Sequence, residues 1–186
     1  MRTDIIRGAL LGILLLGFTI PGTALADDDE RSCSNKGTWF GVVGPDYNLL
    51  TGFVATVTGK SEKGGTNNFE YPVFDPSFSN RPDLELDDVE PFASAVSISS
   101  LRGNWKRVGK NRFAYTFMGF AFDEFGMPVY IAKVSGHTEI INDCQYQYVT
   151  ATMEVFLPWM SPFDDVPIET IELGQFYSYR AKVDLP

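Results

Sequence analysis

The sequence predicts an all-β protein, a single antiparallel up-and-down barrel of about eight strands that carries one long proline-rich loop. Two observations predict this fold. Segments rich in Val, Ile, Thr, Tyr and Phe follow one another along the chain, and short turns such as "GKN", "EFG" and "ND" join them. Helical periodicity of apolar residues is found nowhere after residue 26. A meander of that many tightly connected strands closes most economically into a barrel.

The first residues have the pattern of a cleavable secretory signal. Arg2 and Arg7 precede the apolar run "ALLGILLLGF", and the small-residue pattern from Ala24 to Ala26 follows it. We expect residues 1–26 to be a signal peptide that is cleaved after Ala26, so the mature protein is predicted to be secreted or periplasmic. The apolar run is too short for a stable membrane span, and no later stretch approaches the length that a spanning helix needs.

The charge of the chain is strongly acidic. The full sequence has 15 Lys and Arg against 24 Asp and Glu, a net charge of −9. Removing the predicted signal takes away two arginines and one aspartate, which leaves −10. A protein of this charge repels nucleic acid and anionic membranes, so we expect no nucleic-acid partner, and the plain interpretation of the acidity is solubility.

The chain has two cysteines, Cys33 and Cys144. In an oxidising compartment an even number of cysteines favours pairing. The pair lacks the CxxC spacing of reactive thiols, so we predict a structural disulfide between them. It would close a loop of about 110 residues and contribute about 4–5 kcal/mol in the chain-entropy model.

The first half of the mature chain divides into an acidic leader, residues 27–36, and the start of the barrel domain, residues 37–186. Residues 37–44 and 49–59 read as strands, separated by the turn "PDYN". Residues 60–92 are punctuated by prolines and glycines and by the acidic "DLELDDVE", a composition that excludes a regular helix. We expect a loop insertion there, with room for one short strand around "FEYPVF". Such a loop is either a lid or binding loop over the barrel's mouth, or a mobile surface loop without a role in binding.

The strand pattern becomes denser after residue 92. Five β-rich segments follow in succession and bring the barrel to about eight strands. They cover residues 93–109, 111–123, 127–141, 144–158 and 169–184.

The strand over residues 112–122 is apolar on both faces. Phe113, Tyr115 and Phe117 share one face, and we expect this face to point inward because Gly119 and Ala121 continue it with space rather than bulk. The opposite face is also largely apolar. An outer face of this kind must be covered by a loop, a helix or a partner.

The next strand has one face of small and apolar residues, including Tyr130, Ala132, Val134 and Gly136, which we expect to be the inner one. Its small residues leave room inside the barrel, and the phenol of Tyr130 or the hydroxyl of Thr138 provides a polar anchor. Two interpretations stay open, since an eight-stranded barrel either is filled by its own side chains or holds one small ligand.

The first and last strands carry a family pattern. The triplet Gly37-Thr38-Trp39 opens the first strand, and Arg180 lies in the last one within "YSYRAKV". This arrangement resembles the calycin or lipocalin superfamily, in which a Gly-x-Trp opens strand one and a basic residue of the final strand packs across the Trp at the barrel's base. The resemblance implies barrel-closing roles for Gly37, Trp39 and Arg180, or Lys182 in place of Arg180. Residues 103–136 are also similar to small uncharacterised secreted bacterial proteins with lipocalin-like barrels, in the run G-x-W-x-R-x-G followed by F-x-x-T-F.

Candidate catalytic groups are few, and we expect neither a metal nor a cofactor. His137 is the single histidine, which excludes a multi-histidine metal site, and the acidic segments lack the spacing of a calcium loop. Ser135, His137 and Glu139 share one strand face, but neighbours two residues apart on a strand point in parallel, as on a solvated outer face. Glu154 is the one strong candidate for a carboxylate inside the barrel.

Three functions are compatible with these residues. The favoured one is a non-enzymatic exported barrel, a carrier or sensor that binds a small hydrophobic or aromatic ligand. The second is an enzyme on a similar barrel, resembling allene oxide cyclase or dirigent proteins, which would use a buried carboxylate or phenol. The third is an envelope interaction module without a pocket. The residues predicted to line the ligand site are Phe113, Tyr115, Phe117, Tyr130, Ala132, Val134, Gly136 and Glu154.

Overall fold

The computed structural model describes residues 32–42, 52–70, 76–78, 85–86 and 88–181. The predicted signal peptide, its cleavage site after Ala26 and Lys182 lie outside these residues. Within them, no helix is long and apolar enough to cross a membrane. The described residues form nine strands: β1 Gly37–Val42, β2 Gly52–Ser61, β3 Gly64–Glu70, β4 Ser97–Ile98, β5 Leu101–Arg107, β6 Arg112–Phe122, β7 Pro128–Ile141, β8 Tyr146–Phe156 and β9 Glu169–Arg180.

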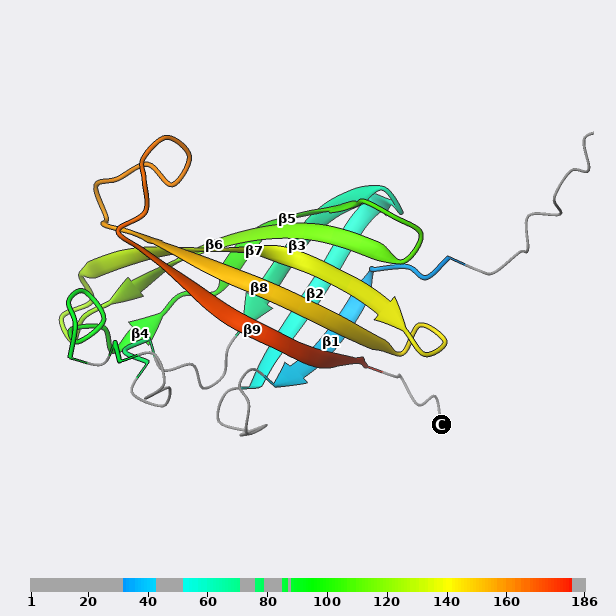
Figure 1. Ribbon diagram of the computed structural model, residues 1–186, viewed down its shortest axis with the longest axis horizontal. Helices are drawn as coiled ribbons and strands as arrows, with labels where there is room; N and C mark the ends of the chain where they lie inside the picture. Colours follow the sequence, from blue (N-terminus) through cyan, green and yellow to red (C-terminus); the bar gives the residue numbers. More distant parts are fainter. Residues whose placement is uncertain (1–31, 43–51, 71–75, 79–84, 87, 182–186) are drawn as a thin grey trace, which may run out of the picture. The chain divides into compact units, whose positions relative to one another are not determined.

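Eight of the strands hydrogen-bond in a closed ring, which confirms the predicted all-β antiparallel up-and-down barrel (Figure 1). Apart from β4, each strand is antiparallel to the next one along the chain, and β9 returns to pair with β1. The ring is uneven. β6 and β7 pair along the whole of β6, whereas β1 and β9 meet only where Trp39 to Gly41 face Arg180 to Ser178.

β4 is a short addition to the ring. Ser97 and Ile98 pair with the end of β6, beyond the point where β5 leaves it. Between β4 and β5, the N–H of Ser99 donates to the Phe120 carbonyl at 2.8 Å, and the Phe120 N–H donates to the Ser99 hydroxyl at 3.0 Å. The segment predicted as one strand over residues 93–109 is therefore two strands with a break at residues 99–100.

The expected loop at residues 60–92 begins later than predicted. β2 continues to Ser61, and β3 occupies Gly64–Glu70, so the first part of the stretch is a hairpin. The prediction took Gly64 and Gly65 as loop punctuation. In the structure Gly65 allows close packing inside the sheet, because a Cβ there would overlap the carbonyl oxygen of Thr58.

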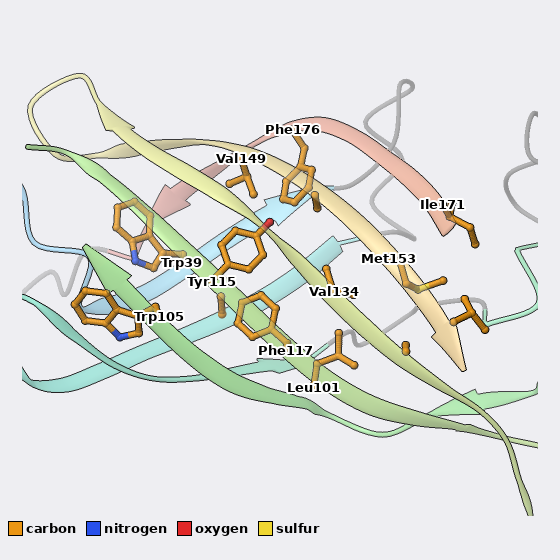
Figure 2. Close-up of a cluster of buried hydrophobic side chains, with 14 of the residues drawn as sticks. Trp39, Leu101, Trp105, Tyr115, Phe117, Val134, Val149, Met153, Ile171 and Phe176 are labelled. Carbon is orange, nitrogen blue, oxygen red and sulfur yellow. The ribbon is translucent and has the colours of Figure 1, made fainter. Parts of the chain in front are cut away.

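The interior of the ring is an apolar core contributed by strands from every part of the domain (Figure 2). The face predictions for β6 and β7 are confirmed. The inner residues of these two strands that are buried are Phe113, Tyr115, Phe117, Ala121, Tyr130, Ala132, Val134, Thr138 and Ile140. The core therefore follows the two-residue alternation that the sequence displays.

Candidate functional site

One end of the ring is crossed by residues 32–36, which we call the N-terminal strap. The predicted disulfide is present and ties Cys33 of the strap to Cys144 in the turn between β7 and β8. The backbone of Cys33 is held further, because its N–H donates to Asn111 Oδ1 at 2.8 Å and its carbonyl accepts from Arg107 Nη2 at 2.9 Å. A formed disulfide indicates an oxidising location outside the cytoplasm.

Behind the strap, Trp39 lies fully buried with Arg180 over its ring. The guanidinium carbon of Arg180 is 4.4 Å from the ring centroid, and the indole Nε1 donates to the Asn35 carbonyl at 3.0 Å. The guanidinium also donates to the carbonyls of Ser34 and Lys36, so one side chain joins the last strand to the strap. Burial lowers the pKa of Arg180 below its usual value, but a guanidinium remains cationic at neutral pH.

A buried polar layer completes this end of the barrel. Gln147 Nε2 donates to Asn35 Oδ1 at 2.8 Å, and the hydroxyl of Ser178 donates to Gln147 Oε1 at 3.0 Å. All three side chains are buried. Gln147 and Ser178 sit on the inward faces of β8 and β9, so a polar residue in an apolar alternation was the available signal, and the sequence prediction missed it. Together with the strap, this layer seals the base.

The middle of the interior is lined by aromatic and small side chains. Tyr115 stacks on Phe117, with ring centroids 4.7 Å apart, and its hydroxyl donates to the Thr150 carbonyl at 2.8 Å. The sequence predicted open space beside Gly136, and this prediction is wrong. The hydroxyl of Tyr115 occupies that position, and a Cβ on Gly136 would overlap the Thr150 carbonyl oxygen and lie 2.8 Å from the phenol oxygen. The small inward-facing side chains of Ala55, Ala132 and Ala151 are buried in the same apolar core.

The other end of the interior is covered by parts of the proline-rich stretch. Tyr130, near the start of β7, is fully buried, and its hydroxyl donates to the Pro76 carbonyl at 2.9 Å. The ring of Phe92 lies 5.4 Å from that of Tyr130, and the ring of Phe78 lies 5.6 Å from that of Phe92. We call Phe78 and Phe92 the aromatic lid. Both are buried, which means that this part of the stretch packs into the barrel's mouth.

Glu154 does not line the interior. Its neighbours Met153 and Val155 are the buried, inward-facing residues of β8, so Glu154 points outward. Its carboxylate forms an ion pair with Lys133 Nζ at 2.7 Å, across the register that pairs β8 with β7. The predicted interior carboxylate is therefore part of an outer cross-strand pair, and the enzyme hypothesis loses its strongest candidate group.

The interior has little acid–base capacity. Among the buried side chains of the described residues there is no Asp, Glu, His, Lys or Arg. His137 and Glu139 are exposed on the outer face of β7, as predicted for a solvated surface. Over the same described ranges, no group of three or more His, Cys, Asp or Glu side chains is placed to hold a metal ion.

Comparison of the chain with protein-family models, curated proteins and solved structures finds no match in any of the three. The closed ring of eight strands and the contact between Trp39 and Arg180 are consistent with the lipocalin resemblance. Membership of that superfamily has no support from a family match, so the function has to be argued from the geometry of the chain itself.

Proposed function

We propose that the protein is an exported, non-enzymatic barrel that binds a small uncharged, apolar or aromatic ligand in its interior. The observation that carries the proposal is the composition of that interior. It is lined by aromatic and small apolar side chains, and none of its buried described residues carries a carboxylate, an imidazole, an ammonium or a guanidinium. Such a lining favours apolar molecules, and the acid–base groups that its described residues offer are phenols rather than carboxylates or imidazoles.

The two phenols in the interior narrow the class of ligand further. Tyr115 donates its proton to the Thr150 carbonyl, and Tyr130 donates its proton to the Pro76 carbonyl. Each phenol has one proton and gives it to a carbonyl, so neither phenol donates a hydrogen bond to a ligand. A ligand with an apolar body, which needs no hydrogen bond donated by the interior, suits this lining.

The mouth is the expected route of entry. The base is closed by the disulfide, by Arg180 and by the buried polar layer, and opening it would break several of these interactions together. The aromatic lid is held by ring contacts, by the backbone hydrogen bonds of Phe92 with Val89 and Ala95, and by the hydrogen bond from Tyr130 to the Pro76 carbonyl. A shift of Phe78 and Phe92 would open the interior without breaking the disulfide or the buried polar layer.

The test uses the uncharged fluorescent probe N-phenyl-1-naphthylamine and the mature protein. We expect saturable fluorescence enhancement with the wild type. Ala132→Leu adds bulk to a fully buried, inward-facing position and should weaken binding at least tenfold while the protein stays folded. Ser135→Leu on the same strand adds similar bulk outside the barrel and is the matched control.

A filled core would give a different result. In that case the wild type shows no saturable enhancement, and Ala132→Leu lowers the free energy of unfolding by about 1–3 kcal/mol through overpacking. That outcome would overturn the ligand-binding proposal and favour the interaction module. Phe92→Ala provides a second readout, because removing half of the aromatic lid should accelerate association of the probe.

A further inference from the structure

A hollow lies on the outside of the barrel, lined by residues of the neighbouring strands β5, β6 and β7. It has a volume of about 490 Å³, which is within the range of small-molecule sites. Outward-facing residues of the three strands form its floor. Phe163, from the segment that connects β8 to β9, contributes to its wall. Trp105 and Tyr115, whose side chains are buried in the interior, also border the hollow, so the sheet itself lies between the hollow and the interior.

One part of the hollow is apolar. Its floor includes Ala114 and Met118 on the outer face of β6, the face whose apolar character predicted a cover. Phe163 is the only large apolar side chain that the connecting segment brings to this hollow among the described residues, and it is 74% exposed. An exposed ring beside an apolar floor leaves surface that a bound apolar group would remove from water.

The charge at the hollow is opposite to that of the chain. The chain has a net charge of −9, yet the lining includes Lys106 and Lys133 and no Asp or Glu. The ammonium of Lys133 is balanced by the carboxylate of Glu154 at 2.7 Å. Lys106 is exposed and takes part in no ion pair within the described residues, so it presents an uncompensated positive charge.

Acidic residues near Phe163 are engaged within their own segment. The hydroxyl of Ser161 donates to Asp164 Oδ2 at 2.7 Å, and the N–H of Ser161 donates to Asp165 Oδ2 at 2.7 Å. These bonds tie both carboxylates to the backbone turn that carries Phe163. Neither of them lines the hollow, so they do not compete with a ligand for Lys106.

The register of the sheet sets the separation of the charged and apolar parts. Lys106 faces Ala114 across the pair β5–β6, and Met118 lies four residues further along β6. Four residues of a strand span about 13 Å. Asn104 and Thr116 face one another between these two positions and provide polar side chains at the middle.

From this arrangement we propose that the outer hollow binds a small amphipathic anion, with its carboxylate or sulfonate at Lys106 and its apolar body on Met118 and against Phe163. The site differs from the interior in the class of ligand, because the interior has no cation at a comparable position. The proposal does not depend on whether the interior is occupied.

The experiment titrates the mature protein with the anionic probe 1-anilinonaphthalene-8-sulfonate, alongside the uncharged probe N-phenyl-1-naphthylamine. We expect Lys106→Gln to weaken binding of the anionic probe about tenfold, as for loss of a charge-assisted hydrogen bond, and added salt to weaken wild-type binding. Phe163→Ala should weaken it to a similar extent. Lys60→Gln removes an exposed lysine outside the hollow and should have no effect.

Binding of the uncharged probe should be the same in all three variants, since its predicted site is the interior. Circular dichroism confirms that each variant is folded. The proposal is overturned if the wild type does not bind the anionic probe saturably, or if Lys106→Gln and Phe163→Ala leave its binding unchanged. If Ala132→Leu is the only variant that no longer binds the anionic probe, the probe binds inside the barrel, and the proposal of an outer site is equally overturned.

Discussion

Replacing Trp39 with alanine tests the interactions at the barrel's base. The side chain is 0% exposed, so its removal leaves a large cavity, and such Trp→Ala changes cost about 3–5 kcal/mol in free energy of unfolding. We expect the upper part of this range. The change also removes the indole donor to the Asn35 carbonyl, worth about 0.5–1.5 kcal/mol, and the aromatic partner of Arg180, worth about 0.5–2 kcal/mol.

Urea unfolding followed by circular dichroism measures the effect, and a domain of this size is expected to be stable enough for a folded baseline. A double-mutant cycle with Arg180→Met isolates the contact between the two side chains, and we expect a coupling of about 1 kcal/mol. Trp159→Ala is the matched control. Trp159 is 79% exposed, so its loss should change stability by less than about 0.5 kcal/mol. A Trp39→Ala protein within 1 kcal/mol of the wild type, or a coupling of zero, would refute the reasoning.

Two further predictions concern the strap and its neighbours. Thiol titration of the unfolded, unreduced protein should find no free sulfhydryl, and two free thiols per chain would contradict the disulfide. Replacing both Cys33 and Cys144 with serine should lower the free energy of unfolding by up to about 4–5 kcal/mol. The pKa of Glu62 lies below its usual value of 4.5, mainly because the ammonium of Lys36 hydrogen-bonds to it. A depressed carboxyl pKa stabilises the folded state above pH 4.5, and this contribution disappears as the pH falls through the folded-state pKa. Glu62→Gln should therefore flatten the acid side of a stability-versus-pH curve, and a curve identical to that of the wild type would count against the interaction.

The alternation of β6 and β7 allowed the inner residues of both strands to be predicted from the sequence. Phe113, Phe117, Ala132 and Val134 are buried as expected, because strand faces repeat every two residues and the repeat is a local property of the chain. The disulfide could be predicted by counting. Two cysteines in a chain with a predicted export signal have one intramolecular pairing available to them, whatever the fold.

Glu154 shows where the same local argument fails. The outer face of β8 also carries apolar residues, such as Tyr148 and Phe156, so alternation alone did not distinguish inside from outside. The pairing of Glu154 with Lys133 decides the matter, and it depends on the register between two strands. The prediction of open space beside Gly136 was wrong for a related reason. Its free space is taken by the hydroxyl of Tyr115, which approaches from the neighbouring strand.

The sequence by itself determined the strand content, the inner faces of β6 and β7 and the cysteine pair, because each of these follows from residue types at fixed short spacing or from simple counting. The tertiary structure alone decided the sealed base, where Gln147 bonds to Asn35 from 112 positions away, and the outer hollow, where Phe163 lies beside β6. These features require atoms that are remote in the sequence to lie within a few ångströms of each other. The distances between these atoms depend on the registers of all eight paired strands together. Local patterns of residues do not determine those registers.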